Sequence, residues 1–235
     1  MYLQAALNGD REHPAAPRTP DAIAKEASAA VAAGARSLHL HPYDAQGRET
    51  LEAGSCAATL QAVRGVCPEV PVSLSTSSAI EPDPERRLAL IAGWTELPDL
   101  VTVNQGEEGI DELCRLLRER RVHIEAGLLS VQDARVFVAT DLVALCDRAM
   151  VEPLDADPGA ATVHAEAIER VLNDADVRLP QVHHGDGIAS WAVNRQAIAR
   201  GHGIRTGLED TPVLPDGRLA TGNGELVAAA AALLD

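Results

Sequence analysis

Residues 19–41, TPDAIAKEASAAVAAGARSLHLH, contain one complete unit of the fold that we predict for this chain. Thr19 and Pro20 suit the N-cap and the first position of a helix, and Gly34 suits its end. The run Arg36–His41 that follows is short and aliphatic, as is typical of a buried strand. The stretch therefore predicts a helix that leads into a strand.

This unit recurs along all 235 residues. Short aliphatic runs alternate with amphipathic segments such as residues 110–119, whose apolar side chains repeat with the helical period. A last aliphatic helix is expected at Leu226–Leu234. We expect eight strands, at Leu3–Asn8, Arg36–His41, Val70–Ser75, Leu100–Asn104, Val122–Ala126, Ala149–Glu152, Leu179–His184 and Ile204–Leu208.

Eight strand and helix units of about 29 residues each are near the smallest size for a (β/α)8 (TIM) barrel, which usually has about 250 residues. We therefore predict an α/β fold in which residues 1–235 form a single (β/α)8 barrel domain. A doubly wound open sheet is the alternative, but Leu7-Asn8-Gly9-Asp10 lacks the G-x-G-x-x-G turn typical of that fold. Since only 2% of the residues are aromatic, we expect branched aliphatic side chains to fill the barrel and alanine-rich helices to surround it.

The chain is acidic, with 20 Lys and Arg against 35 Asp and Glu and a formal net charge of −15. This charge argues against nucleic acid and anionic membranes as partners. Asp10 and Arg11 fall where a signal peptide would be apolar, and no apolar run approaches the roughly 18 residues of a membrane span. No C-x-x-C pair is present, so we interpret the cysteines as reduced core thiols of a cytoplasmic protein; they are Cys56, Cys67, Cys114 and Cys146.

Polar side chains gather at the predicted C-terminal ends of the strands, where barrel enzymes place their chemistry. A polar residue at one strand end is common, but polar residues at nearly all eight indicate a lined pocket. The residues concerned are Asn8, His39, His41, Ser75, Thr76, Thr102, Asn104, Glu125, Glu152, His183, His184, Arg205, Glu209 and Asp210.

His39 and His41 stand two positions apart on a predicted strand, so both imidazoles face the same way and can share one metal ion. Glu209 follows the last strand, and in a closed barrel the second and eighth strands both flank the first. Two imidazoles and a carboxylate suit Zn²⁺. The alternatives are a hydrogen-bonded histidine pair and a structural salt bridge between Arg205 and Glu209.

Two further features each have two interpretations. The segment His184-Gly185-Asp186-Gly187 opens a predicted helix, and its glycines serve either a ligand at the helix N-terminus or the turn alone. Glu125 and Glu152 are either partners of the metal-site histidines or satisfied polar residues of the barrel mouth.

The order and spacing of these residues resemble the beta-keto acid cleavage enzymes, whose best-known activity is 3-keto-5-aminohexanoate cleavage in lysine fermentation. The resemblance covers nearly the whole chain. It implies a (β/α)8 fold, bound Zn²⁺, a homo-oligomer, and conversion of a beta-keto acid and acetyl-CoA into acetoacetate and a new CoA thioester. The matching segments are Asn8-Gly9, His39-Leu40-His41, Ser75-Thr76, Thr102-x-Asn104, Arg205-x-Gly207-Leu208-Glu209-Asp210 and Asn223.

The resemblance also implies roles for single residues. His39, His41 and Glu209 match the zinc ligands, and Arg205 and Asp210 match a catalytic dyad in which the aspartate is the base. Ser75 and Thr102 match hydroxyl residues that contact the substrate. On this basis the expected substrate-binding residues are Asn8, Ser75, Thr76, Thr102, Asn104 and His184.

The chain departs from the family pattern in three places. The family has a further acidic zinc-site residue after the first strand; here either Asp10 or Glu12 substitutes for it or this ligand is absent. Ser77-Ser78 replace two glycines after the third strand. After the sixth strand a glycine-rich segment is replaced by residues 151–155, in which Glu152 and Asp155 would repel the phosphates of CoA. Two other functions therefore stay open: a metal-dependent hydrolase of the amidohydrolase type, and a non-catalytic metal-binding barrel that has lost CoA binding.

Overall fold

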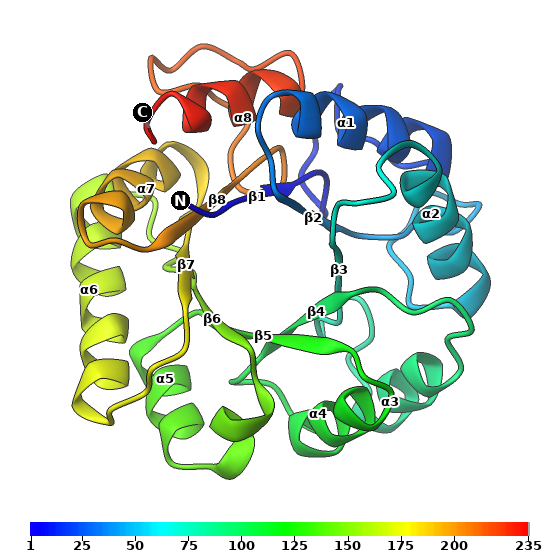
Figure 1. Cartoon of the computed structure of the whole chain (residues 1–235), viewed down its shortest axis with the longest axis horizontal. Coiled ribbons are helices and arrows are strands. Elements are labelled where there is room, and N and C mark those ends of the chain that lie inside the picture. Colours follow the sequence, from blue (N-terminus) through cyan, green and yellow to red (C-terminus); the bar gives the residue numbers. More distant parts are fainter. Residues whose placement is uncertain (235) are drawn as a thin grey trace.

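The computed structural model of the chain describes residues 1–234 as a closed barrel of eight parallel strands surrounded by helices (Figure 1). The strands follow one another in sequence order, and β8 pairs with β1 to close the barrel. The predicted (β/α)8 architecture is confirmed. The strands are β1 (Leu3–Ala6), β2 (Ser37–Leu40), β3 (Val72–Ser75), β4 (Leu100–Asn104), β5 (His123–Leu128), β6 (Arg148–Val151), β7 (Gln181–His183) and β8 (Gly203–Thr206).

Helices connect the strands on the outside of the barrel, and their ends follow from the sequence. Thr19 caps α1 as predicted, because its Oγ1 accepts a hydrogen bond of 3.3 Å from Ala22 N. The helices are α1 (Pro20–Ala32), α2 (Ala53–Val66), α3 (Pro84–Ala92), α4 (Ile110–Glu119), α5 (Val131–Val138), α6 (Pro158–Asp174), α7 (Ser190–Ala199) and α8 (Asn223–Ala231), with 3-10 turns η1 (Asp141–Leu145) and η2 (Gly187–Ala189).

All eight predicted strands exist; β4 has the predicted bounds, and the ends of the other seven differ from the predicted ranges by two residues at most. Strand β2 ends at Leu40 and β8 ends at Thr206, so His41 and Glu209 lie in the segments that follow these strands. A hydrophobic pattern does not mark where ladder hydrogen bonds stop. The backbone at both residues is therefore positioned by contacts other than strand pairing: Asn8 bonds to the backbone of His41, and Ala6 O accepts from Glu209 N.

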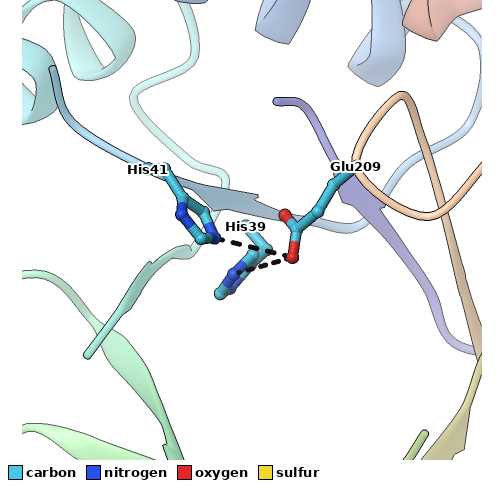
Figure 2. Close-up of side chains that lie close together, drawn as sticks. All are labelled: His39, His41 and Glu209. Atoms are coloured by element: carbon cyan, nitrogen blue, oxygen red, sulfur yellow. Dashed lines mark ion pairs between the residues drawn. The ribbon is translucent and has the colours of Figure 1, made fainter. Parts of the chain in front are cut away.

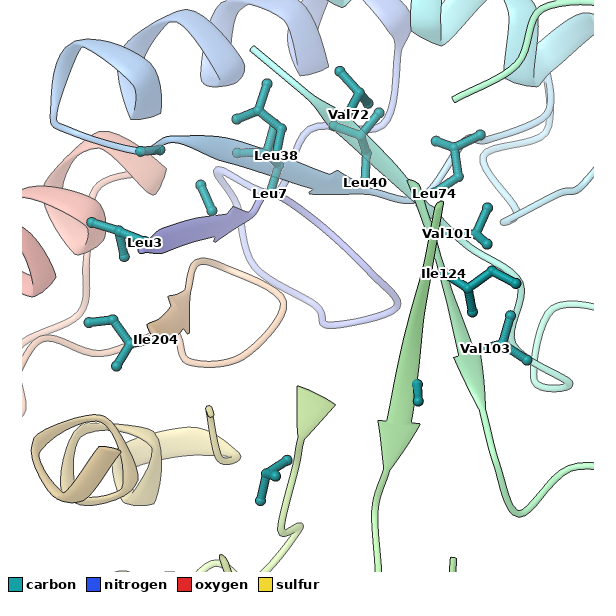
Figure 3. Packing of buried hydrophobic residues seen from close by; sticks show 14 of the residues in the cluster. Leu3, Leu7, Leu38, Leu40, Val72, Leu74, Val101, Val103, Ile124 and Ile204 are labelled. Carbon is teal, nitrogen blue, oxygen red and sulfur yellow. The ribbon is translucent and has the colours of Figure 1, made fainter. Parts of the chain in front are cut away.

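The barrel interior is polar, so the prediction that branched aliphatic residues fill it is wrong. Gln4 on β1 donates to Glu125 on β5 across 2.9 Å, and because these strands lie on opposite sides of the barrel, the bond crosses its centre. The aliphatic residues alternate to the outer face and pack under the helices. The residues labelled in Figure 3 are Leu3, Leu7, Leu38, Leu40, Val72, Leu74, Val101, Val103, Ile124 and Ile204.

Two other predictions concern the whole chain. The four cysteines are free and buried, as predicted. Across the described residues, the helices are too short or too polar to cross a membrane.

Candidate active site

His39, His41 and Glu209 come together at the C-terminal end of the barrel. One potential ligand atom from each side chain lies within 4.8 Å of the other two. The Oε1 atom of Glu209 is 3.6 Å from His39 Nε2 and 3.5 Å from His41 Nε2. Figure 2 shows both imidazoles facing the carboxylate. The structure thus brings together the three side chains that the sequence proposed as one cluster.

Strand β1 provides the link between the two halves of this cluster. It lies between β2 and β8, and Ala6 pairs with His39. Beyond β8 the chain passes so close to β1 that a Cβ on Gly207 would lie 1.9 Å from Ala6 O. Glu209 N then donates to the same carbonyl across 3.3 Å. Glycine at 207 therefore lets the chain carry Glu209 over the end of β1 toward the histidines.

The imidazole nitrogens that face away from Glu209 also have oxygen neighbours. His39 Nδ1 lies 3.3 Å from Ser73 Oγ and 3.4 Å from Thr102 Oγ1. Both hydroxyls donate to Glu125 Oε2, at 2.6 and 3.2 Å respectively. Glu125, which the sequence offered as a partner of the histidines, therefore contacts His39 only indirectly, through these two hydroxyl groups.

The donor set fits a metal ion. Two ligands of zinc, each about 2.0–2.1 Å from the ion at tetrahedral angles, stand about 3.3 Å apart, close to the 3.5 and 3.6 Å separations here. Within the described chain, His41 Nε2 and Glu209 Oε2 are buried without a hydrogen-bond partner, which a purely structural ion pair would leave unexplained. Burial lowers the pKa of His39 to about 3, so this imidazole is neutral and available as a ligand.

Arg205 and Asp210 form a buried ion pair beside this cluster. Arg205 Nη2 donates to Asp210 Oδ1 at 2.6 Å and to Glu209 Oε1 at 3.0 Å. Burial alone would raise the pKa of Asp210, but Arg205 and His184 outweigh it and lower the pKa. Asp210 is therefore an ionised carboxylate with its oxygens occupied by cationic partners.

His184 lies between two carboxylates. Its Nδ1 is 3.3 Å from Asp210 Oδ1 and its Nε2 is 3.3 Å from Glu152 Oε2. Burial and Arg205 oppose protonation of His184, but Asp210 and Glu152 outweigh them and raise its pKa to about 9. Glu152 thus contacts His184 and not the histidine pair. The neighbouring His183 stacks on His202 at 4.7 Å, away from the cluster.

A cavity of about 230 Å³ opens above the cluster and is strongly acidic. A second cavity of about 730 Å³ adjoins it, and the two share Asp10, Glu49, Ala79 and Ile80 in their walls. The charged residues that line the smaller cavity are Asp10, Arg11, Glu49, Glu152, Asp186, Arg205, Glu209 and Asp210. Six carboxylates against two arginines leave a site that would attract a metal cation.

The predicted substrate-binding residues are buried, except for Asn104, which is half-buried. Asn8 is fully buried and bonds to backbone groups of Pro17 and His41. Thr76 Oγ1 donates to Thr102 O at 2.7 Å, and Asn104 Nδ2 donates to Glu107 at 2.9 Å.

The hydroxyls of Ser75 and Thr102 and the ring of His184 are buried too. A direct contact of any of these six side chains with the substrate stays a prediction. The wall of the smaller cavity includes Ser77 from the segment after β3.

Three residues at the site were missed at the sequence level. Glu49 contacts His41, Ser73 contacts His39, and Arg11 pairs with Asp186 and donates to Glu209 O at 3.0 Å. Ser73 has the same parity as Ser75 on β3, which is a signal that could have revealed it. Glu49 and Arg11 lie in connecting segments whose path the hydrophobic pattern does not specify.

A parallel eight-stranded barrel with a candidate metal site and a buried arginine–aspartate pair at its C-terminal end has the plan of a barrel enzyme. The sequence profile of the family described as "beta-keto acid cleavage enzyme" matches residues 1–235. The chain therefore belongs to the beta-keto acid cleavage enzyme family.

A curated relative agrees with this assignment. The 3-keto-5-aminohexanoate cleavage enzyme of Fusobacterium nucleatum subsp. nucleatum is 28% identical over 249 residues, which cover 97% of this chain and 88% of that protein.

Solved structures share the fold. ObcA in a ternary complex with a C4-CoA adduct and oxalate superposes with a TM-score of 0.75 at 19% identity, over 94% of this chain. The chain spans 64% of the length of that ObcA chain. A thiamine phosphate pyrophosphorylase from Pyrococcus furiosus reaches a TM-score of 0.60 at 12% identity, over 99% of this chain and 95% of that one. These structural likenesses concern the barrel architecture alone.

Proposed function

We propose that this protein is a zinc-dependent enzyme that cleaves a small beta-keto acid with acetyl-CoA as co-substrate, giving acetoacetate and a new CoA thioester. The observation that carries the proposal is the approach of His39 Nε2 and His41 Nε2 to one carboxylate oxygen of Glu209 at 3.6 and 3.5 Å. These three side chains would hold the ion. When bound, zinc would polarise the substrate ketone as a Lewis acid.

Asp210 is the base in this proposal. It would take a proton from the carbon between the ketone and the carboxylate of the substrate, and that carbon would then attack the thioester carbonyl and displace the CoA thiolate. The thiolate would attack the original ketone carbon of the condensed product, and the bond from that carbon to the former nucleophilic carbon would break. This gives the new CoA thioester and the enolate of acetoacetate, which takes the proton back from Asp210. The ion pair with Arg205 at 2.6 Å and the contact with His184 at 3.3 Å support this role, because they keep Asp210 ionised. Its lowered pKa makes it a weak base, so the substrate proton must be acidified by the polarised ketone.

The negative charge of the smaller cavity supports the proposal that a metal ion holds the anionic substrate. Six carboxylates line the cavity and would repel a free keto acid anion, while a bound divalent ion beside Arg205 offers local attraction. The ObcA structures hold oxaloacetate in one case, and a C4-CoA adduct with oxalate in another. These compounds are of the same chemical kinds as the keto acid and the CoA thioester proposed here.

The adjoining cavity of about 730 Å³ is large enough for part of a CoA molecule. Glu152 and Asp155 flank the segment after β6 and would repel CoA phosphates approaching there. We therefore extend the proposal to an approach of acetyl-CoA from the larger cavity, where three arginines could pair with its phosphates and offset part of the charge of five carboxylates. These arginines are Arg18, Arg48 and Arg86. A cytoplasmic homo-oligomer completes the proposal, and the four free buried thiols support a reducing compartment.

Metal analysis of the purified protein and an activity assay test this function together. We expect about one zinc per chain in the wild type and a loss of zinc in His39→Ala and Glu209→Ala. His123→Ala is the matched control, because His123 pairs with Asp147 away from the cluster and should keep its metal. Incubation with a panel of beta-keto acids and acetyl-CoA should yield acetoacetate. Zinc without turnover would favour a non-catalytic barrel, and hydrolysis of amides or lactones instead would favour a hydrolase.

A further inference from the structure

A hairpin after β2 brings the carboxylate of Glu49 next to His41, on the side of the ring that faces away from Glu209. Thr50 N donates to Pro42 O at 3.0 Å, and Tyr43 and Glu49 form an antiparallel bridge. The hydroxyl of Tyr43 donates to Gly9 O, which ties the hairpin to the segment after β1. The hairpin is thus fixed against the site at its base, next to His41.

Glu49 uses this position to contact His41. Its Oε1 lies 2.7 Å from His41 Nδ1, and the two side chains are only 15% and 10% exposed. Neither atom has an aligned hydrogen-bond partner within the described chain. The contact is therefore a close ion pair that a small rotation of either side chain converts into a hydrogen bond.

The two imidazoles then share one arrangement. In each ring, Nε2 faces Glu209 while Nδ1 faces oxygen: the Ser73 and Thr102 hydroxyls for His39, and the Glu49 carboxylate for His41. A histidine that binds metal through one nitrogen usually donates its other N–H to a carboxylate, carbonyl or water. That partner fixes the tautomer, orients the ring and increases the basicity of the ligand nitrogen.

We propose that Glu49 is a positioning residue for the metal centre, which accepts the Nδ1 proton of His41 and thereby presents Nε2 to the ion. This inference rests on the proposed function, because it assumes that His41 is a ligand. The carboxylate contacts its histidine directly, whereas Glu125 reaches His39 only through hydroxyls. Glu49 therefore contributes more to zinc affinity than an uncharged partner would.

Zinc affinity, measured by competition with a chromophoric chelator, tests the inference in the full-length protein. We expect Glu49→Gln, which keeps the size of the side chain and removes its charge, to weaken zinc binding by about 10- to 100-fold. Glu52→Gln is the matched control. It removes the same charge only three residues along the chain, and the Glu52 side chain is exposed and makes no capping bond to α2. Equal zinc affinity in Glu49→Gln and the wild type would overturn the inference.

A second measurement does not depend on any variant. In zinc-loaded wild-type protein with ¹⁵N-labelled histidine, two-dimensional NMR should show His41 coordinated through Nε2 and protonated at Nδ1. Coordination through Nδ1 would overturn the inference, because Glu49 could then not accept that proton. If the wild type binds no zinc at all, the proposed function fails before the role of Glu49 is tested, so the two failures are distinguishable.

Discussion

The side chain of Asn8 holds the backbone of His41 on both sides of the residue: Nδ2 donates to His41 O and Oδ1 accepts from His41 N, each at 2.9 Å. Asn8 is completely buried and also donates to Pro17 O at 3.0 Å. The asparagine after β1 therefore sets the backbone position of a proposed metal ligand after β2.

Asn8→Ala should lower both stability and zinc affinity. The substitution leaves buried backbone groups without partners, at a cost of about 1–3 kcal/mol for each such group. Urea unfolding of the metal-free protein measures the first effect and chelator competition the second. Asn173→Ala on the exposed face of α6 is the control and should change neither value. Unchanged zinc affinity in Asn8→Ala would show that His41 keeps its place without this side chain.

Asp210→Asn should remove activity while leaving the metal in place. A general base contributes roughly 10²- to 10⁴-fold to rate, and the amide cannot accept the substrate proton. Turnover with the best keto acid and the zinc content of the same preparation are the two measurements. Asp216→Asn, in an exposed hairpin, should keep both. Retained turnover in Asp210→Asn would exclude Asp210 as the base.

Gly207→Ala should be severely destabilising. The added Cβ would lie 1.9 Å from Ala6 O, and backbone atoms on both sides must move to relieve that overlap. We expect a loss of about 3 kcal/mol or more in the free energy of unfolding, which is exceptional for one methyl group. Gly54→Ala in α2, where nothing lies within 4 Å, should instead stabilise by about 0.5–1 kcal/mol. A Gly207→Ala protein as stable as the wild type would contradict the close approach of the two segments.

His184 should make stability depend on pH. Because its pKa is raised to about 9 in the folded protein and lies near 6.5 when unfolded, the folded state holds the extra proton between these values. Its contribution to stability is therefore complete below about pH 6.5 and is lost as the pH rises through about 9. In metal-free protein, the stability difference between wild type and His184→Gln should shrink by about 3 kcal/mol across that window. A difference that is constant from pH 6 to 10 would contradict a charged His184 between Asp210 and Glu152.

The part of the site that depends on barrel closure could be predicted from the sequence. His39 and His41 stand two residues apart, and once β1 is known to lie between β2 and β8, Glu209 has to end near them. Strand alternation and the closed topology carry that prediction, and both follow from the hydrophobic pattern.

The direction of single side chains could not be predicted in the same way. Asn8 stands at the end of a strand, where it can face a pocket or a neighbouring backbone equally well, and it faces the backbone of His41. Glu49 reaches the site through a hairpin whose geometry depends on its turn and not on any periodicity. The polar barrel interior was not predicted, because the alternation of polar and apolar residues along a strand shows that its two faces differ. It does not show which face lies inside the barrel.

His39 and His41 come with β2 and Glu209 comes after β8, so the ribosome makes the two histidines first. A nascent chain that stops before β8 would expose two histidines on an open sheet, with no third ligand and no neighbouring strand to bring one. The three proposed ligands come together only once β8 has paired with β1. Binding of an ion by all three would therefore be linked to closure of the barrel, and opening of the seam between β1 and β8 would release it.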